Sequence, residues 1–267
     1  MRDYNFNPRT NSNVAERPTA KLLNKVLNIC LIIASVIGVA VLLFNATYYP
    51  AKVIGPSMYP TFIGAESEKS ENKDIVYLTS PKNLQSGDII VVDYVKSKIN
   101  NTKEDLAIKR LIAKGGDTIY FHAGTIYVNN KKIDEGFKDA AIAWFDDHHI
   151  QGKQHWLDGY NKAKLNFENW CTSAINGTTT YETTFNENYQ LIFNGCIEKD
   201  TTLNTYILTL PENYVFFLGD NGNESLDSST FGPVEQKYVT AKVGFVIHEG
   251  ETVSSYFWKY LKNIFSV

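Results

Sequence analysis

The sequence predicts a mostly β domain that follows one membrane-spanning helix and is interrupted by an inserted region. Residues 22–44 are almost continuously apolar, and short β-type runs fill much of residues 47–131 and 206–267. Residues 132–205 hold three of the four tryptophans and many Asn, Thr and Tyr residues, with weak periodicity. We therefore expect a tail (1–21), a transmembrane helix (22–46), a β domain (47–131 with 206–267) and an inserted subdomain (132–205).

The amino-acid composition limits the number of domains and the classes of partner that the chain can have. The chain has 267 residues, of which 43% are hydrophobic, so it can bury a sizeable core in one large or two small domains. The formal net charge of −3, without a basic stripe interleaved with aromatics, argues against nucleic acid as a partner. The three cysteines lack the paired spacing of zinc sites. Cys30 falls in the apolar segment, so only Cys171 and Cys196 could bridge, and two free thiols fit equally well.

The N-terminal segment predicts a permanent anchor. Residues 1–20 are polar, without a hydrophobic period, and predict a disordered tail. At ~1.5 Å per residue, a helix over residues 22–44 spans roughly the ~30 Å hydrocarbon layer. A cleavable signal peptide would have a shorter apolar region and a small-x-small site, which we do not find. Basic residues crowd the N-terminal side and Lys52 alone follows closely, which places the N-terminus in the cytoplasm; they are Arg2, Arg9, Arg17, Lys21 and Lys25.

The β domain is predicted from its alternating runs. Turn signals separate several of them, such as Ser86-Gly87-Asp88 and Gly115-Gly116-Asp117. The expected strands are residues 75–78, 89–95, 106–113, 118–122, 125–128, 206–210, 214–218 and 239–247. The aromatic stretch 256–265 fits either the membrane interface or a terminal element packed on the domain.

Residues 55–61, GPSMYPT, form the first candidate for chemistry. Pro56 and Pro60 fix two backbone angles and Gly55 permits a close turn, so Ser57 sits on a stiffened, irregular segment. A serine acts as a nucleophile only with a base in hydrogen-bond reach and with donors for the oxyanion. Alone, the stretch fits equally a proline-rich turn with Ser57 as a capping hydroxyl.

Lys109 is the candidate base. The period of a strand places it on one face with Ala107, Leu111 and Ala113, so its neighbours are apolar. Such a lysine either extends its amine to water or loses charge, because desolvation lowers the pKa of an amine. Buried beside Ser57, it would act as a general base.

Other sequence patterns give weaker indications of a functional site. Counted from Asp220, residues 219–234 lack the glycine and glutamate of a calcium-binding EF-hand loop, so a structured turn beside a site is the better interpretation. The GxSxG elbow of hydrolases is missed at its last position. A triad using His122 or His248 ranks below Ser57 with Lys109. A solvated loop explains the remaining acid and histidine cluster better than a metal site does; its members are Asp146, Asp147, His148, His149 and His155.

Four ordered blocks resemble a known family, the bacterial type I signal peptidases. These are membrane-anchored Ser/Lys proteases that remove signal peptides from secreted preproteins. The resemblance implies a signal-peptidase-like antiparallel β catalytic domain. The blocks are GPSMYPT (55–61), GDIIVV (87–92), IKR (108–110) followed by GD (116–117), and GDN (219–221) through Ser225, Asp227 and FGPV (231–234).

The resemblance also implies roles. Ser57 would be the nucleophile, Lys109 its general base, and the Ser225 hydroxyl would orient the amine. The backbone N–H of Ser57 would bind the oxyanion. Some members add a hydroxyl two residues earlier; that position is Gly55 here, so main-chain donors alone would serve.

One block departs from the family pattern. Asp227 matches an acid that supports the site through an ion pair, usually with an arginine two residues later. That position is Ser229 here, and another arginine position of the block is Gly222. We therefore expect Asp227 to pair with Arg110 or to be held by hydroxyls and water.

The sequence thus predicts a single-pass endopeptidase of the bacterial plasma membrane that needs no metal or organic cofactor. As the resemblance implies, it would cut preproteins after small residues, close to membrane lipid and to the secretion translocon. One alternative is an inactive relative that acts as a chaperone or assembly factor for surface proteins. Another, a self-cleaving Ser/Lys repressor, is disfavoured because residues 1–20 are too short for a DNA-binding domain.

Overall fold

The chain forms two compact units, Met1–Thr47 and Tyr48–Val267. The computed structural model describes residues 18–64, 74–97, 106–148, 151–178, 192–193, 195–248 and 250–254. The predicted tail before residue 18 and the aromatic stretch 256–265 lie outside these residues.

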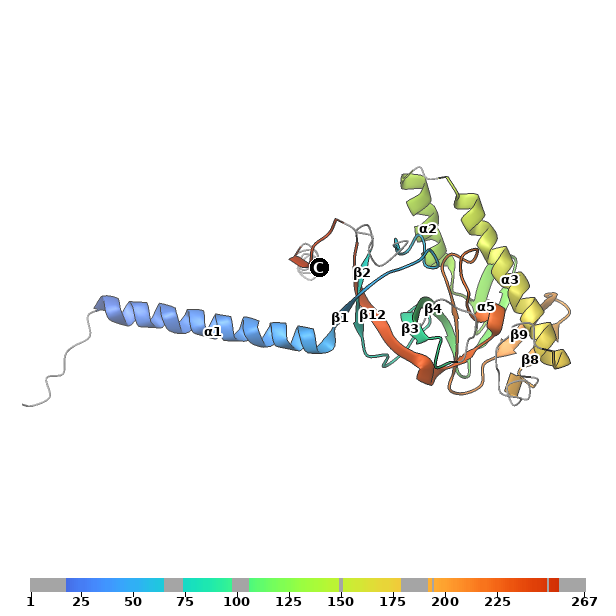
Figure 1. The fold of residues 1–267 in the computed structure, drawn as a ribbon, viewed down its shortest axis with the longest axis horizontal. Helices are drawn as coiled ribbons and strands as arrows, with labels where there is room; N and C mark the ends of the chain where they lie inside the picture. The colour runs from blue at the N-terminus through green and yellow to red at the C-terminus, as the bar shows by residue number, and fades with distance from the viewer. Residues whose placement is uncertain are drawn as a thin grey trace, which may run out of the picture. The chain divides into compact units, whose positions relative to one another are not determined.

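The described part of the first unit is a single helix, α1 (Pro18–Thr47) (Figure 1). It begins at a proline, which suits a first helical turn because the missing N–H needs no partner there. Ser35 and Thr47 donate their hydroxyls to Leu31 O and Leu43 O, each at 2.8 Å, so neither hydroxyl depends on water. Lys21–Thr47 has a hydropathy of 2.9, and within the described residues α1 is the one helix long and apolar enough to cross a membrane. The predicted helix is confirmed with slightly wider bounds.

The second unit contains a seven-stranded antiparallel sheet in the order β1-β2-β12-β3-β4-β10-β11. Its strands are β1 (Tyr49–Lys52), β2 (Ile75–Thr79), β3 (Ile89–Asp93), β4 (Leu106–Lys114), β10 (Tyr214–Leu218), β11 (Val234–Glu235) and β12 (Val239–Ile247). The strand predicted for 89–95 stops at Asp93, because the Asp93 carboxylate accepts the backbone N–H of Lys96 at 2.8 Å and turns the chain.

A second antiparallel sheet has the order β7-β6-β5-β9-β8. Its strands are β5 (Thr118–His122), β6 (Thr125–Val128), β7 (Lys131–Lys132), β8 (Ile197–Asp200) and β9 (Thr205–Thr209). The mostly antiparallel β class predicted from the sequence is therefore confirmed. The short strand β8 falls inside the region that we expected to be inserted.

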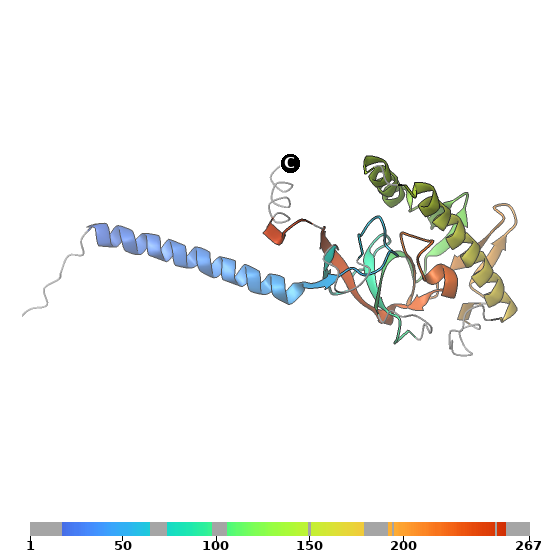
Figure 2. The ribbon, with the colours of Figure 1, turned by 45° about the horizontal axis from the view of Figure 1, so that its top comes forward.

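That region also contains two helices that the sequence analysis did not predict, α2 (Glu135–Asp147) and α3 (Lys153–Asn176). Figures 1 and 2 show α3 lying along one side of the domain, beside the short helix α5 (Ser228–Phe231). A single 3-10 turn, η1 (Gln236–Tyr238), precedes β12. The buried residues of α3 recur at helical spacing, so the periodicity of this segment was underestimated; they include Trp156, Tyr160, Ala163, Phe167, Trp170, Cys171 and Ala174.

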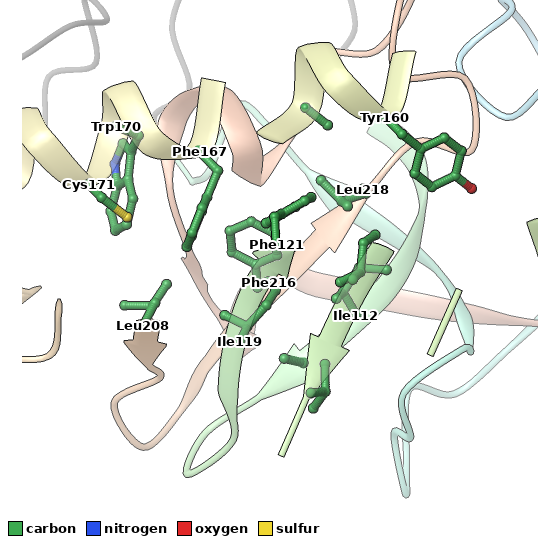
Figure 3. Packing of buried hydrophobic residues seen from close by; sticks show 14 of the residues in the cluster. Ile112, Ile119, Phe121, Tyr160, Phe167, Trp170, Cys171, Leu208, Phe216 and Leu218 are labelled. Carbon is green, nitrogen blue, oxygen red and sulfur yellow. The ribbon is translucent and has the colours of Figure 1, made fainter. Parts of the chain in front are cut away.

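The inserted region shares its core with the strands. In Figure 3, side chains of α3 such as Phe167 and Trp170 face Ile119, Phe121 and Phe216 of the strands, and all belong to one buried cluster. Each large apolar side chain buried there contributes about 1.5–3 kcal/mol relative to exposure. The described residues between 132 and 205 are therefore part of the same compact unit as the β domain.

Strand β4 carries the predicted base into a second apolar cluster. Lys109 is directly opposite Ile90 of β3, and Ala107 is opposite Val92. Residues opposite one another in an antiparallel pair share a face. Ile90, Val92, Ala107 and Leu111 are all buried in this cluster, as the period of two predicted. Ala113, which was predicted on the same face, belongs instead to the first cluster together with Ile112, where the pairing of β4 with β10 shifts in register.

Candidate active site

Ser57 lies on a tight loop that is fixed on both sides. Tyr59 N donates to Pro56 O at 3.1 Å, and Phe62 N donates to Met58 O at 3.0 Å. The side chains of Met58 and Phe62 are buried in a third apolar cluster, while Ser57 remains half-buried. Gly55 has φ 81°, in the region that favours glycine, and a side chain on Gly64 would collide with Gly55 O. The loop thus holds Ser57 in one defined place.

Lys109 reaches this serine from the sheet. Its side chain is 1% exposed, and Nζ lies 2.9 Å from Ser57 Oγ and 3.2 Å from Ile108 O. The amine is therefore held away from water, in contact with the Ser57 hydroxyl. The structure therefore brings together the two residues that were predicted to act together.

The loop after β10 packs against the Ser57 loop. Asn221 donates its backbone N–H to Ser57 O at 3.0 Å and its side-chain Nδ2 to Pro56 O at 3.2 Å. A Cβ on Gly219 would lie 2.6 Å from Ser57 O and would overlap the Ser225 hydroxyl. Only glycine allows these three segments to approach so closely, and the approach places Ser225 beside the Ser57 loop.

Asp227 is held by hydroxyls and backbone donors. Its Oδ2 accepts the Ser225 hydroxyl at 2.5 Å and Gly219 N at 2.9 Å. Its Oδ1 accepts the Ser229 hydroxyl at 2.7 Å and Ser229 N at 3.1 Å, which caps α5. Ser229, which stands where the family pattern has arginine, thus supplies two of the four hydrogen bonds.

Arg110 has a different partner from the one considered for it. Its Nε and Nη2 form a buried bidentate pair with Asp220, at 2.7 and 2.6 Å, and Nη1 donates to Gly87 O at 3.1 Å. Thr61 also donates its hydroxyl to Asp220, at 2.5 Å. Burial opposes the charge of the guanidinium, but the charge and hydrogen bonds of Asp220 outweigh it and raise the pKa of Arg110. The pairing of Arg110 with Asp227 was wrong. Arg110 instead ties Asp220, next to Gly219, to the strand that carries Lys109.

The remaining predicted residues lie in other contacts. His248 Nδ1 is 3.1 Å from the buried carboxylate of Asp74, and His122 ends β5 in the second sheet. Cys171 and Cys196 are free thiols. Among the described residues, which exclude His149, there is no group of three or more His, Cys, Asp or Glu side chains arranged for a metal ion.

A cavity of about 780 Å³ opens beside the loop. Pro60 and Thr61, just beyond Ser57, line one part of it, Arg110 lines another, and Phe137 and Trp144 of α2 supply an apolar wall. Sequence reasoning missed this wall because it missed α2.

A buried amine in contact with a serine hydroxyl, on an antiparallel β domain, is the arrangement expected of a serine hydrolase whose base is lysine. The sequence model of the family described as signal peptidase, peptidase S26, matches residues 26–248. The chain belongs to this family, and the resemblance stated from the four blocks is confirmed.

The individual relatives that the chain matches are also signal peptidases. Signal peptidase I of Bacillus amyloliquefaciens is 34% identical over 101 residues, which cover 38% of this chain and 47% of that protein. Signal peptidase I T of Bacillus subtilis is 32% identical over 122 residues, covering 46% and 58%. The chain thus spans about half the length of these two relatives. Signal peptidase IB of Staphylococcus aureus is 27% identical over 196 residues, covering 73% and 75%.

Among solved structures, a signal peptidase I from Enterococcus faecalis shares 24% identity and covers 61% of this chain and 97% of its own, with a TM-score of 0.32. At this TM-score the likeness adds no argument to the family assignment.

Proposed function

We propose that the protein is a membrane-anchored serine endopeptidase that removes signal peptides from secreted preproteins. Membership of the signal peptidase family supports the substrate class. The observation that carries the mechanism is the 2.9 Å contact between the buried Nζ of Lys109 and Oγ of Ser57. In that geometry the Ser57 hydroxyl can donate its proton to a neutral amine.

In the acylation step, Nζ of Lys109 takes the proton of Ser57 while Oγ attacks the scissile carbonyl carbon. The tetrahedral intermediate carries its negative charge on the former carbonyl oxygen, and the backbone N–H of Ser57 donates to that oxygen. The Lys109 ammonium then returns its proton to the leaving amine as the peptide bond breaks. An acyl-enzyme on Ser57 results, and the mature protein leaves first.

In the second step, water replaces the leaving amine. Neutral Lys109 accepts a proton from this water as the water oxygen attacks the ester carbonyl. Collapse of the intermediate breaks the bond to Oγ, and the proton returns to Ser57. The signal peptide leaves with a new carboxylate, so both residues regain their starting state and no metal or organic cofactor is needed.

Ser225 would orient the amine between these steps. Its hydroxyl hydrogen is directed at Asp227 Oδ2 at 2.5 Å. The lone pairs of the Ser225 oxygen therefore remain available to accept an N–H of Lys109. Asp227 acts through Ser225, as a positioning residue.

Anchoring belongs to the same proposal. Helix α1 would hold the catalytic domain at the outer surface of the plasma membrane, with the N-terminus in the cytoplasm, because the basic residues cluster before the helix and in its first turns. Cleavage sites of signal peptides carry small residues before the cut, so we expect a preference for such residues.

The full chain in detergent, incubated with a preprotein bearing an Ala-x-Ala site, tests the proposal. Ser57→Ala and Lys109→Met should both abolish cleavage, and loss of the base alone costs about 10²–10⁴-fold in rate. Lys114→Met is the matched control, because Lys114 is an exposed lysine at the end of the same strand. Wild-type activity should fall as the pH is lowered, since protonation removes the base.

Three outcomes separate the alternatives. Cleavage that survives Lys109→Met points to another base, such as a histidine. A wild-type chain that binds the preprotein but leaves it intact supports the inactive, chaperone-like alternative. Loss of activity in Lys114→Met as well would show that the strand, rather than the Lys109 amine, is being perturbed.

A further inference from the structure

Helices α2 and α3 contact the nucleophile loop directly. Trp156 of α3 is 2% exposed and donates its indole N–H to Tyr59 O at 3.1 Å. The Tyr59 ring packs edge-on against Trp144 and Phe145 of α2, with centroid distances of 5.2 and 5.7 Å. Tyr59 is two residues beyond Ser57, so both helices help to fix the position of the nucleophile.

One turn further along, α3 touches the loop that carries Ser225. A Cβ on Gly159 would lie 2.9 Å from Asn223 N and 3.0 Å from Gly222 N. A Cβ on Gly222 would in turn overlap Gly159 O. The two backbones therefore meet where both residues are glycine.

Polar contacts also join α3 to the loop that carries Ser225 and to α5. Lys162 donates its amine to Asn223 O at 2.7 Å, and Asn223 donates its side-chain amide to His155 O. Further along α3, Asn166 donates to the Thr230 hydroxyl of α5 at 3.2 Å. Helix α3 therefore contacts this segment at both ends, at Gly222 and Asn223 and at Thr230 of α5, which Asp227 caps.

We propose that α3 is a clamp that sets the distance between Ser57 and the loop of Ser225, with Trp156 and Gly159 as positioning residues. The effect of this clamp on catalysis depends on the proposed function. Its physical basis is that proton transfer requires heavy atoms within hydrogen-bond reach, so a displacement of ~1 Å can cost about 10²-fold in rate. A glycine in a helix interior is unfavourable relative to alanine, and here only glycine permits the close approach.

Two variants of the clamp test the proposal, each with a matched control. Trp156→Phe removes the indole N–H and keeps an aromatic ring, while Trp170→Phe makes the same change at a residue of α3 that packs on Phe167 and Phe193. Gly159→Ala inserts a methyl group at the junction, while Gly136→Ala inserts one in α2, where the space is open. All four are made in the full chain.

The measurements are kcat, KM, the pH profile of kcat/KM, and hydrogen exchange of peptides covering residues 55–62 and 219–225. We expect Trp156→Phe and Gly159→Ala to lower kcat about 10–100-fold with little change in KM. We also expect a shifted acidic limb of the pH profile and faster exchange in both peptides. The two controls should keep the wild-type kcat and exchange rates, whatever their melting temperatures.

Hydrogen exchange separates this proposal from the proposed function. If the wild-type chain cleaves no preprotein but exchange in both loops rises only in the clamp variants, the clamp stands and the function falls. Unchanged exchange in the clamp variants, or equal effects in the controls, overturns the clamp even when Ser57→Ala abolishes cleavage. A change in KM alone also overturns it, since misplaced catalytic groups lower kcat.

Discussion

At the scale of single residues, Asp227 shows how a site tolerates a missing ion pair. A buried carboxylate must be satisfied by charge or by hydrogen bonds. Two serine hydroxyls and two backbone N–H groups satisfy it here, and one of those hydroxyls belongs to Ser229. The sequence could present both solutions but could not choose between them, because the choice depends on where Arg110 points.

Asp227→Asn tests this arrangement. The amide keeps the size of the side chain but replaces one accepting oxygen by a donor, which faces other donors. We expect the free energy of unfolding to fall by about 1–3 kcal/mol and kcat to fall at least about tenfold, because Ser225 loses its acceptor. Denaturant unfolding and cleavage assays measure the two effects.

Ser229→Ala is the matched control, since it removes one hydroxyl and leaves the Ser225 contact. It should cost about 1 kcal/mol of stability with kcat near wild type. Full activity in Asp227→Asn would remove Asp227 from the mechanism.

At the scale of elements, α1 and eight of the twelve described strands were predicted, whereas α2, α3 and the four short strands β1, β7, β8 and β11 were not. The period of two in residues 106–113 identified β4 and the face of Lys109 because strand neighbours are local in sequence. In α3 the apolar positions do follow a helical period, from Trp156 through Ala174. Gly159 and several asparagines within α3 lower its helix propensity, which is why the segment was not recognised as a helix.

The buried face of α3 also predicts thiol reactivity. Burial raises the pKa of Cys171 well above its ordinary value of 9.0, and burial also raises the pKa of the half-buried Cys196. Thiolates react and thiols do not, so at pH 8 iodoacetamide should modify Cys196 about tenfold or more faster than Cys171. Mass spectrometry of a Cys30→Ser variant measures both rates.

The same pKa shift has a stability consequence. The folded chain favours the neutral Cys171 thiol, so the contribution of this thiol to the free energy of unfolding is complete below pH 9.0. That contribution is lost as the pH rises above 9.0, because the same thiol ionises in the unfolded chain. In denaturant both thiols should react alike. Equal rates in the folded chain would show that α3 opens readily.

At the scale of the whole molecule, the two compact units differ in whether their apolar side chains are buried. The three apolar clusters belong to residues 48–267, and the side chains described for α1 are largely exposed. The catalytic unit therefore has its own core, and α1 supplies a surface that suits lipid. We therefore expect activity toward a substrate in a membrane to depend on both units, and folding of the catalytic domain to depend on one.

A chain lacking residues 1–47 tests this division. We expect it to keep its cooperative thermal unfolding and to cleave a short soluble peptide with kcat within a few-fold of the full chain. Cleavage of a preprotein inserted in vesicles should slow by about 10²–10⁴-fold, because enzyme and substrate no longer share a surface. A truncated chain that does not fold would contradict the independence of its core.

The amino-acid sequence was enough to predict the apolar span, most of the strands and the pair Ser57 and Lys109, because periodicity and motif spacing record local geometry. Three features depend on how the chain folds: Arg110 binds Asp220, hydroxyls hold Asp227, and α3 lies against both loops. These contacts join residues separated by as many as 110 positions, or depend on which of several competing donors comes nearest. Such choices are made by packing, since a side chain takes the partner that the assembled backbone brings within reach.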